Sequence, residues 1–173
     1  MNNFMKLFAI FVVLIQIQSA LSQPNQLIQQ LCKKTLYQAL CVSTLNLDPR
    51  SKTSNLQGLG SISIDATRKK VNETLTYVIS VFGDTRGRED YERYGTCIEE
   101  FGASVRRFLP AASADLKAKR YVQAVSNMKD VLLAPKVCGD QWPTEYPLEL
   151  ARRNKDVHDI AAMTIDIIKT FVN

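Results

Sequence analysis

Apolar side chains recur at helical spacing along most of this chain of 173 residues. The longest run extends from Glu89 to Lys117, and its apolar positions follow one another at intervals of three or four residues: Tyr91, Tyr94, Ile98, Phe101, Val105, Phe108, Ala112 and Leu116. This period predicts a long amphipathic helix, which Pro110 is expected to kink because proline lacks the backbone N–H. Such an aromatic stripe is typical of a bundle core rather than of a ligand site.

Three other segments show the same period and predict three more helices. They cover residues 59–84, 121–133 and 152–172, and the second is expected to stop before Pro135 and to leave Cys138 in a loop. Strand-like alternation is nearly absent. The pattern therefore predicts an all-α chain whose main part is an antiparallel four-helix bundle with short links.

Ahead of this bundle the leucine spacing changes. This segment contains five leucines, and their spacing slips by one residue between the second and the third: Leu27, Leu31, Leu36, Leu40 and Leu45. Two short helices folded into a hairpin, pinned by a disulfide between Cys32 and Cys41, would explain the slip. We therefore expect a short disulfide-pinned helical hairpin before the bundle.

The first residues read as a secretory signal peptide, residues 1–22. A single Lys6 precedes the apolar run Leu7 to Ile15, and a polar stretch with small residues follows. Cleavage before Gln23 places Ala20 and Ser22 at the two small positions, and cleavage after Ala20 is nearly as good. The apolar run is about half of the roughly 20 residues that a membrane anchor needs. Export would leave residues 23–173 as one domain.

The chain has four cysteines, Cys32, Cys41, Cys97 and Cys138, and an even number in an exported protein indicates pairing. Four cysteines allow three connectivities, of which the sequential one is the easiest to build. In that pairing the second bridge ties two neighbouring helices together. A zinc site is disfavoured, because the chain has no CxxC pair and only one histidine.

Charge and motifs exclude several classes of function. The formal net charge of +5 comes from basic residues interspersed with acidic ones, without the basic stripe of a nucleic-acid-binding protein. The sole histidine, His158, lies among carboxylates on a polar helix face, with no serine nucleophile context. Phosphate loops, dinucleotide fingerprints and HExxH motifs are absent, so we expect neither an enzyme nor a cofactor. Asn72-Glu73-Thr74 is an N-glycosylation sequon that export would make usable at Asn72.

The cysteine framework, with Cys32-x8-Cys41, then Cys97 in a tyrosine-rich helix and Cys138 before a closing helix, resembles the plant invertase and pectin methylesterase inhibitor family. The resemblance covers essentially all of residues 23–173. It is strengthened by local stretches, of which the second and third are most similar to invertase inhibitors of the plane-tree pollen-allergen type: Leu31-Cys32-Lys33-Lys34-Thr35, Leu47-Asp48-Pro49-Arg50-Ser51-Lys52, Leu56-Gln57-Gly58-Leu59-Gly60 and Cys97-Ile98-Glu99-Glu100-Phe101.

The resemblance implies a secreted protein that inhibits a plant carbohydrate-active enzyme by forming a complex with it. Acid invertase in the cell wall is the first expectation, and the vacuole is a second compartment. Inhibition of pectin methylesterase and a non-inhibitory scaffold of the same fold are the alternatives. The family fold implies a helical hairpin pinned by one disulfide and a second disulfide inside the bundle. A protein partner, no cofactor and a monomeric free state are expected.

In the invertase inhibitors of this family a Pro-Lys-Phe motif between two bundle helices enters the sucrose pocket, and the corresponding turn here reads Lys119-Arg120-Tyr121. Lys119 stands where proline is expected, and Gly139 replaces a glutamate that usually follows the last cysteine. A guanidinium at Arg120 would find charge-assisted partners in the carboxylate pair of a retaining glycosidase, while Tyr121 packs against the rim. The competing interpretation makes Arg120 a helix-end charge and Tyr121 a core residue.

Overall fold

The computed structural model describes residues 26–172, and within that range it contains helices and no strand. The predicted signal peptide, residues 1–22, lies outside the described residues. A helix over residues 26–32 begins the described chain. The remaining elements are α2 (Gln38–Leu47), the 3₁₀ helix η1 (Pro49–Thr53), α3 (Leu56–Asp84), α4 (Arg88–Ala103), the π-helical turn η2 (Ser104–Phe108), α5 (Leu109–Lys117), α6 (Tyr121–Gly139) and α7 (Leu148–Lys169).

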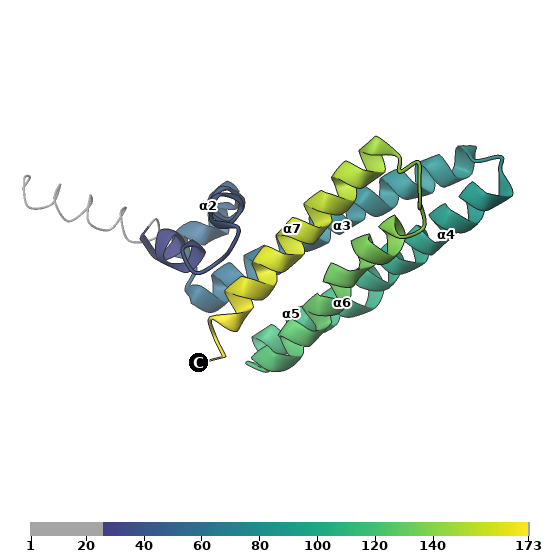
Figure 1. The fold of residues 1–173 in the computed structure, drawn as a ribbon. Helices are drawn as coiled ribbons and strands as arrows, with labels where there is room; N and C mark the ends of the chain where they lie inside the picture. Colours follow the sequence, from purple (N-terminus) through teal and green to yellow (C-terminus); the bar gives the residue numbers. More distant parts are fainter. Residues whose placement is uncertain (1–25, 173) are drawn as a thin grey trace, which may run out of the picture.

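The predicted all-α, four-helix architecture is confirmed. Helices α4, η2 and α5 follow one another without a break and form one rod, which packs with α3, α6 and α7 in an antiparallel bundle (Figure 1). The hairpin made by residues 26–32 and α2 lies beside the beginning of α3. The link between α5 and α6 is at this same end of the bundle, and the link between α3 and α4 is at the other (Figure 1).

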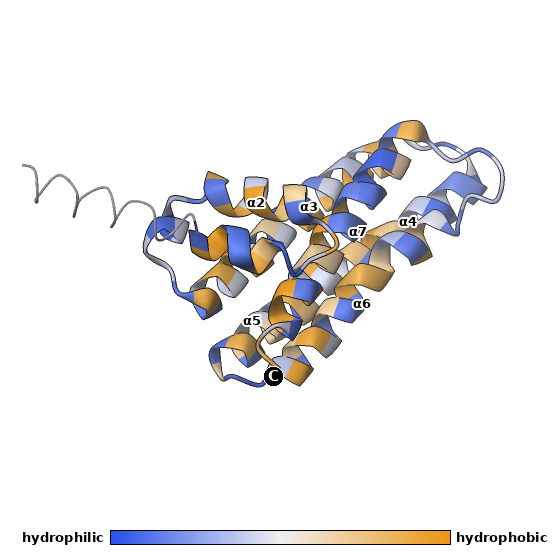
Figure 2. Cartoon of the chain, turned by 60° about the vertical axis from the view of Figure 1, so that its left-hand side comes forward, coloured by the Kyte–Doolittle hydropathy of each residue, from blue (hydrophilic) through white to orange (hydrophobic). Residues whose placement is uncertain are grey.

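Two apolar clusters hold the molecule together. The larger fills the bundle around side chains with no exposed surface, such as Phe101, Leu116 and Met128. The smaller joins the hairpin to α3 and α7 through Leu31, Leu45 and their neighbours. Hydrophilic and hydrophobic residues alternate along the helices (Figure 2), as the helical period of the apolar positions predicts.

Two disulfides are present, and they have the sequential pairing that the spacing favoured. Cys32–Cys41 joins the two arms of the hairpin, with Cα atoms 5.5 Å apart. Cys97–Cys138 joins α4 to α6, with Cα atoms 4.6 Å apart, in the interior of the bundle. The hairpin therefore has a covalent tie of its own, separate from that of the bundle.

The irregularity expected at Pro110 takes the form of a π-helical turn directly before it. In this turn the backbone N–H of Leu109 donates to the carbonyl oxygen of Ser104, five residues earlier. Pro110 is the second residue of α5. The wider turn is a common way for a helix to absorb a local mismatch in its hydrogen-bond ladder, here at a residue that has no N–H.

The prediction that the third bundle helix stops before Pro135 is wrong. Helix α6 continues through Pro135 to Gly139, so Cys138 lies in a helix rather than in a loop. An interior proline costs about 3 kcal/mol in an isolated helix. Here the Cys97–Cys138 bridge holds the end of α6, and Asn154 of α7 donates to the carbonyl oxygen of Pro135 at 3.0 Å. These tertiary ties outweigh the local propensity.

Candidate functional site

The turn between α5 and α6 is a helix C-terminal cap of the Schellman type. The backbone N–H of Arg120 donates to the carbonyl oxygen of Asp115 at 2.8 Å, and that of Lys119 donates to Leu116 at 3.1 Å. Lys119 itself adopts a left-handed conformation, with φ of 59°. This bond pattern defines the motif, in which glycine usually takes the left-handed position.

This backbone accounts for the departure from proline at position 119. A proline ring fixes φ near −65°, so proline cannot adopt the left-handed conformation of Lys119. Proline would also remove the N–H that bonds to Leu116. The turn in this protein is therefore built on a different local device from a proline-led turn, and lysine at this position is compatible with it.

Arg120 is exposed, with 56% of its side-chain surface accessible, and its guanidinium is held by Asp115. Nη2 lies 2.6 Å from Asp115 Oδ1, and Nε donates to the same oxygen at 2.8 Å. Asp115 is only 13% exposed, and its second oxygen accepts from Asn127 Nδ2 at 2.9 Å. Arg120 is thus oriented by a carboxylate that is itself fixed between α5 and α6.

Tyr121 differs from its two neighbours, because it is half-buried and packs against the main core. Its ring lies 5.5 Å from the ring of Phe171, between centroids. The turn therefore brings Lys119 and Arg120 together on the surface and directs much of Tyr121 toward the bundle. The next residue, Val122, is apolar and exposed, with 63% of its surface accessible. The periodic pattern of apolar residues did not point to Val122, because Val122 lies outside the apolar stripe of its helix.

Helix α3 supports this turn from outside. Gln57 Nε2 donates to the carbonyl oxygen of Leu116 at 2.9 Å, which caps one of the last carbonyls of α5. Gly60, one turn further along α3, allows the close approach of Phe171, since a Cβ atom there would lie 2.9 Å from the Phe171 ring. The Leu56–Gly60 stretch thus has a structural role at the turn that the sequence alone did not reveal.

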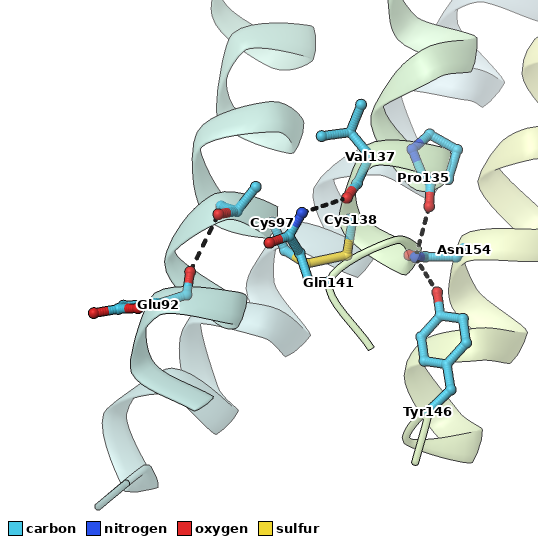
Figure 3. The surroundings of a disulfide bond; sticks show 9 residues. Glu92, Cys97, Pro135, Val137, Cys138, Gln141, Tyr146 and Asn154 are labelled. Atoms are coloured by element: carbon cyan, nitrogen blue, oxygen red, sulfur yellow. Dashed lines mark hydrogen bonds between the residues drawn. A yellow bond between two sulfur atoms is a disulfide. The ribbon is translucent and has the colours of Figure 1, made fainter. Parts of the chain in front are cut away.

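The other end of α6 has a separate cluster around the Cys97–Cys138 bridge (Figure 3). Trp142 contacts the rings of Tyr94 and Tyr146, at centroid distances of 5.1 and 5.7 Å. Burial raises the pKa of Tyr146, whose hydroxyl is bonded to Asn154. A Cβ atom at Gly139 would lie 2.9 Å from the Tyr146 hydroxyl, so Tyr146 occupies the space that a side chain at position 139 would need.

This cluster is remote from the α5–α6 turn. Cys138 is near the last residue of α6 and Tyr121 is its first, which places them about 25 Å apart at 1.5 Å per helical residue. The two ends of α6 therefore have different neighbours, with the disulfide at one and the exposed Arg120 at the other.

Asn72 and His158 both lie on polar helix faces. Asn72 is exposed on α3, whereas Thr74 of the same sequon is buried and donates to the carbonyl oxygen of Lys70 at 3.0 Å. His158 on α7 is 49% exposed and has Asp159 as its neighbour, with Nδ1 3.1 Å from Oδ1. His158 therefore has the surroundings of a solvated surface residue, as the sequence indicated.

Between residues 26 and 172, no group of three or more histidine, cysteine, aspartate or glutamate side chains is arranged to hold a metal ion. Within the same range, no helix combines the length and the apolar character that crossing a membrane requires.

Comparison with known proteins identifies relatives along most of the chain. The model of the family described as plant invertase/pectin methylesterase inhibitor matches residues 26–167. A pectinesterase inhibitor from Actinidia deliciosa is 32% identical over 105 residues, which cover 57% of this chain and 57% of that protein. The cell wall / vacuolar inhibitor of fructosidase 2 from Arabidopsis thaliana is 27% identical over 89% of this chain and 88% of its own length.

The fold also has a solved counterpart. The crystal structure of a mutant form of a pectin methylesterase inhibitor from Arabidopsis superposes with a TM-score of 0.67 at 20% sequence identity. The superposition covers 80% of this chain and 92% of the other. At this level of identity the likeness establishes a shared fold.

Proposed function

The chain belongs to the plant invertase/pectin methylesterase inhibitor family, and we propose that the enzyme it inhibits is an acid invertase. Members of this family are inhibitors of invertase or pectin methylesterase and are not enzymes. We further propose that residues 23–173 form the mature inhibitor domain and act in the cell wall. The name of one relative covers both the cell wall and the vacuole.

The observation that carries the proposal is the exposed guanidinium of Arg120 at a bundle end. Its Asp115 partner and the Schellman turn fix its position before any complex forms. Pre-ordering reduces the entropy lost on binding. Invertase acts as a retaining glycosidase with two carboxylates in its pocket, and a guanidinium makes short, charge-assisted bonds to carboxylates. Arg120 therefore has the charge and the rigidity that insertion into such a pocket requires.

Tyr121 has a smaller part in this proposal than in the sequence-based hypothesis. Its ring packs on Phe171 and the core, so its contribution is to hold the turn against the bundle. The exposed surface beside Arg120 is formed by Lys119 and Val122. We propose Lys119, Arg120 and Val122 as the residues that contact the target, and Tyr121 as the residue that positions them.

Pectin methylesterase is the second candidate target. The relative with the higher identity of the two described above is a pectinesterase inhibitor, although the matched part is shorter. A bundle of this fold is also found in a pectin methylesterase inhibitor. A protein that keeps the scaffold without inhibiting either enzyme is the third outcome.

Parallel inhibition assays of oxidised protein against acid invertase and pectin methylesterase test the proposal. We expect inhibition of invertase and a loss of at least about tenfold with Arg120→Ala, the cost of removing one charged hydrogen-bonding anchor. Arg88→Ala is the matched control, since it removes the same side chain, 91% exposed, from the opposite end of the bundle.

The outcomes separate the candidates. Unchanged invertase inhibition by Arg120→Ala would refute the anchor, and an equal loss in Arg88→Ala would attribute the effect to net charge. Inhibition of pectin methylesterase alone would select the second target. Inhibition of neither enzyme would leave the scaffold hypothesis.

A further inference from the structure

A cleft between α3 and α7 is separate from the α5–α6 turn. These two helices lie side by side along the bundle (Figure 1). The cleft has a volume of about 860 Å³ and is lined by charged and polar side chains, among them Arg68, Lys69, Asn72, Thr76, Arg152 and Arg153. A volume of this size lies within the usual range for ligand sites, about 300 to 1,000 Å³.

The cleft continues into a second groove beside the N-terminal hairpin. That groove has a volume of about 560 Å³, and its apolar lining includes Leu40, Leu47 and Ile62. Asp65 and Lys69 line both hollows, so the two adjoin. Leu47 is 84% exposed at the edge of this surface. The combined groove has a charged part between α3 and α7 and a part beside the hairpin where apolar side chains adjoin Asp48 and Arg50.

Positive charge exceeds negative charge in the cleft. Each of its three carboxylates already has a cationic partner: Arg50 for Asp65 at 3.0 Å, Lys70 for Glu73 at 3.4 Å, and Arg152 for Asp156 at 3.1 Å. Arg68 and Lys69 form no ion pair with any residue between 26 and 172. Two adjacent cations therefore remain available to an anionic ligand.

Arg68 and Arg153 are half-buried in the wall of the cleft. Nε of Arg68 is buried and has no hydrogen-bond partner among the described residues. The guanidinium carbon of Arg153 lies 4.5 Å from the centre of the Tyr77 ring, a cation–π contact. A guanidinium presents a planar donor pair, which matches the geometry of a carboxylate, and the buried Nε of Arg68 is a donor without a partner within residues 26–172.

We propose that this groove binds an acidic oligosaccharide, a chain of uronate sugars with free carboxylates. Arg68 and Lys69 pair with carboxylates, and Thr76 bonds to a sugar hydroxyl. The apolar part beside Leu47 packs on the C–H faces of pyranose rings. A single inorganic anion would use little of this length. Hydrolysis of the methyl esters of pectin produces such chains, so binding would retain the inhibitor on its surrounding polymer.

The test is calorimetric titration of oxidised, unglycosylated protein with a short unesterified oligogalacturonate. The protein lacks a glycan at Asn72 so that the cleft is uncovered. The same oligomer with all carboxylates methyl-esterified is the second probe, and a poly-glutamate peptide of equal charge is the third. The variants are Lys69→Gln, the double variant Arg68→Gln/Lys69→Gln, and the control Lys33→Gln/Lys34→Gln. The control removes another adjacent, exposed basic pair from the hairpin.

We expect saturable binding of the unesterified oligomer, weakened by at least about tenfold in the double variant, because two charge-assisted contacts are lost. Lys69→Gln, at an exposed position, should weaken it by a smaller factor without affecting folding. The control variant Lys33→Gln/Lys34→Gln should bind the unesterified oligomer as tightly as the wild-type protein does. The wild-type protein should bind the esterified oligomer much more weakly.

Three results would overturn the proposal. One is equal weakening by the control pair, which would indicate general electrostatic attraction. Another is equal binding of the esterified oligomer, and the third is equal or tighter binding of the peptide, which would assign the groove to an acidic protein segment. None of these readouts depends on enzyme inhibition, so the proposed function can fail or succeed independently.

Discussion

At the scale of single residues, Lys119 stands out because its backbone adopts a left-handed conformation that favours glycine over lysine. A left-handed backbone costs a non-glycine residue about 1 to 2 kcal/mol, and Lys119 adopts it with φ of 59°. The Schellman bonds of the neighbouring residues outweigh this cost, and the conformation places Arg120 beside Asp115. Local strain at position 119 and the orientation of Arg120 are therefore two aspects of one turn.

Lys119→Gly should raise the free energy of unfolding by about 1 kcal/mol, because glycine adopts this conformation without a Cβ clash. Lys119→Pro should lower it by about 3 kcal/mol or more, because the ring excludes the observed φ and removes an N–H bond. Urea denaturation of the oxidised proteins measures both. The control Lys117→Gly, two residues earlier at the last position of α5, should lower stability by up to about 1 kcal/mol. A stabilised Lys119→Pro would contradict the observed turn.

At the scale of elements, the helices were predictable where the local sequence and the tertiary structure agree. Gly83-Asp84 ends α3 as expected, and the leucine slip correctly indicated a hairpin. The end of α6 was not predictable, since Pro135 is tolerated only through contacts with α4 and α7. The ion pair of Arg120 with Asp115 was also hidden, because it depends on a left-handed lysine where no glycine marks the turn.

The two disulfides should stabilise different elements. By loop-closure entropy, the bridge with a sequence separation of 41 contributes about 4 kcal/mol and the one with a separation of 9 about 3 kcal/mol. Cys97→Ala/Cys138→Ala should therefore lower the global free energy of unfolding more than Cys32→Ala/Cys41→Ala does.

Amide hydrogen exchange separates local from global opening. Removing the hairpin bridge should speed exchange in α2 and residues 26–32 while α6 keeps its protection, because the hairpin has its own apolar cluster. Removing the bundle bridge should speed exchange at the end of α6. Uniform loss of protection in both variants would show that hairpin and bundle unfold as one unit.

At the scale of the whole molecule, two separate surfaces carry the two proposals. The α5–α6 turn is at the end of the bundle near the hairpin (Figure 1). The basic cleft is lined by residues of α3 and α7. Carboxylates paired with cations line the cleft, so protonation of a carboxylate there would increase the net positive charge of the cleft. This links the surface of the molecule to the acidity of its surroundings.

Glu149 tests that link, because it bonds to both arginines at the edge of the cleft. The hydrogen bonds from Arg152, with its charge and that of Arg153, lower the pKa of Glu149 from 4.5 to about 2. The pKa is depressed in the folded state, so the stabilisation from Glu149 is present above the unfolded value. It is lost progressively as the pH falls from about 4.5 through about 2. The pairs of Glu149 with Arg152 and Arg153 are therefore still ionised at about pH 4.

Glu149→Gln should accordingly be less stable than the wild-type protein at about pH 6, and the gap should close as the pH approaches about 2. The effect should be small, because the group is exposed and screened by solvent. Urea midpoints at a series of pH values measure the gap, with Glu99→Gln as a control whose carboxylate forms no ion pair within residues 26–172. A gap that stays constant between about pH 6 and about pH 2 would show that the arginines do not lower the pKa of Glu149. Glu149 would then lose its charge near its ordinary pKa of 4.5.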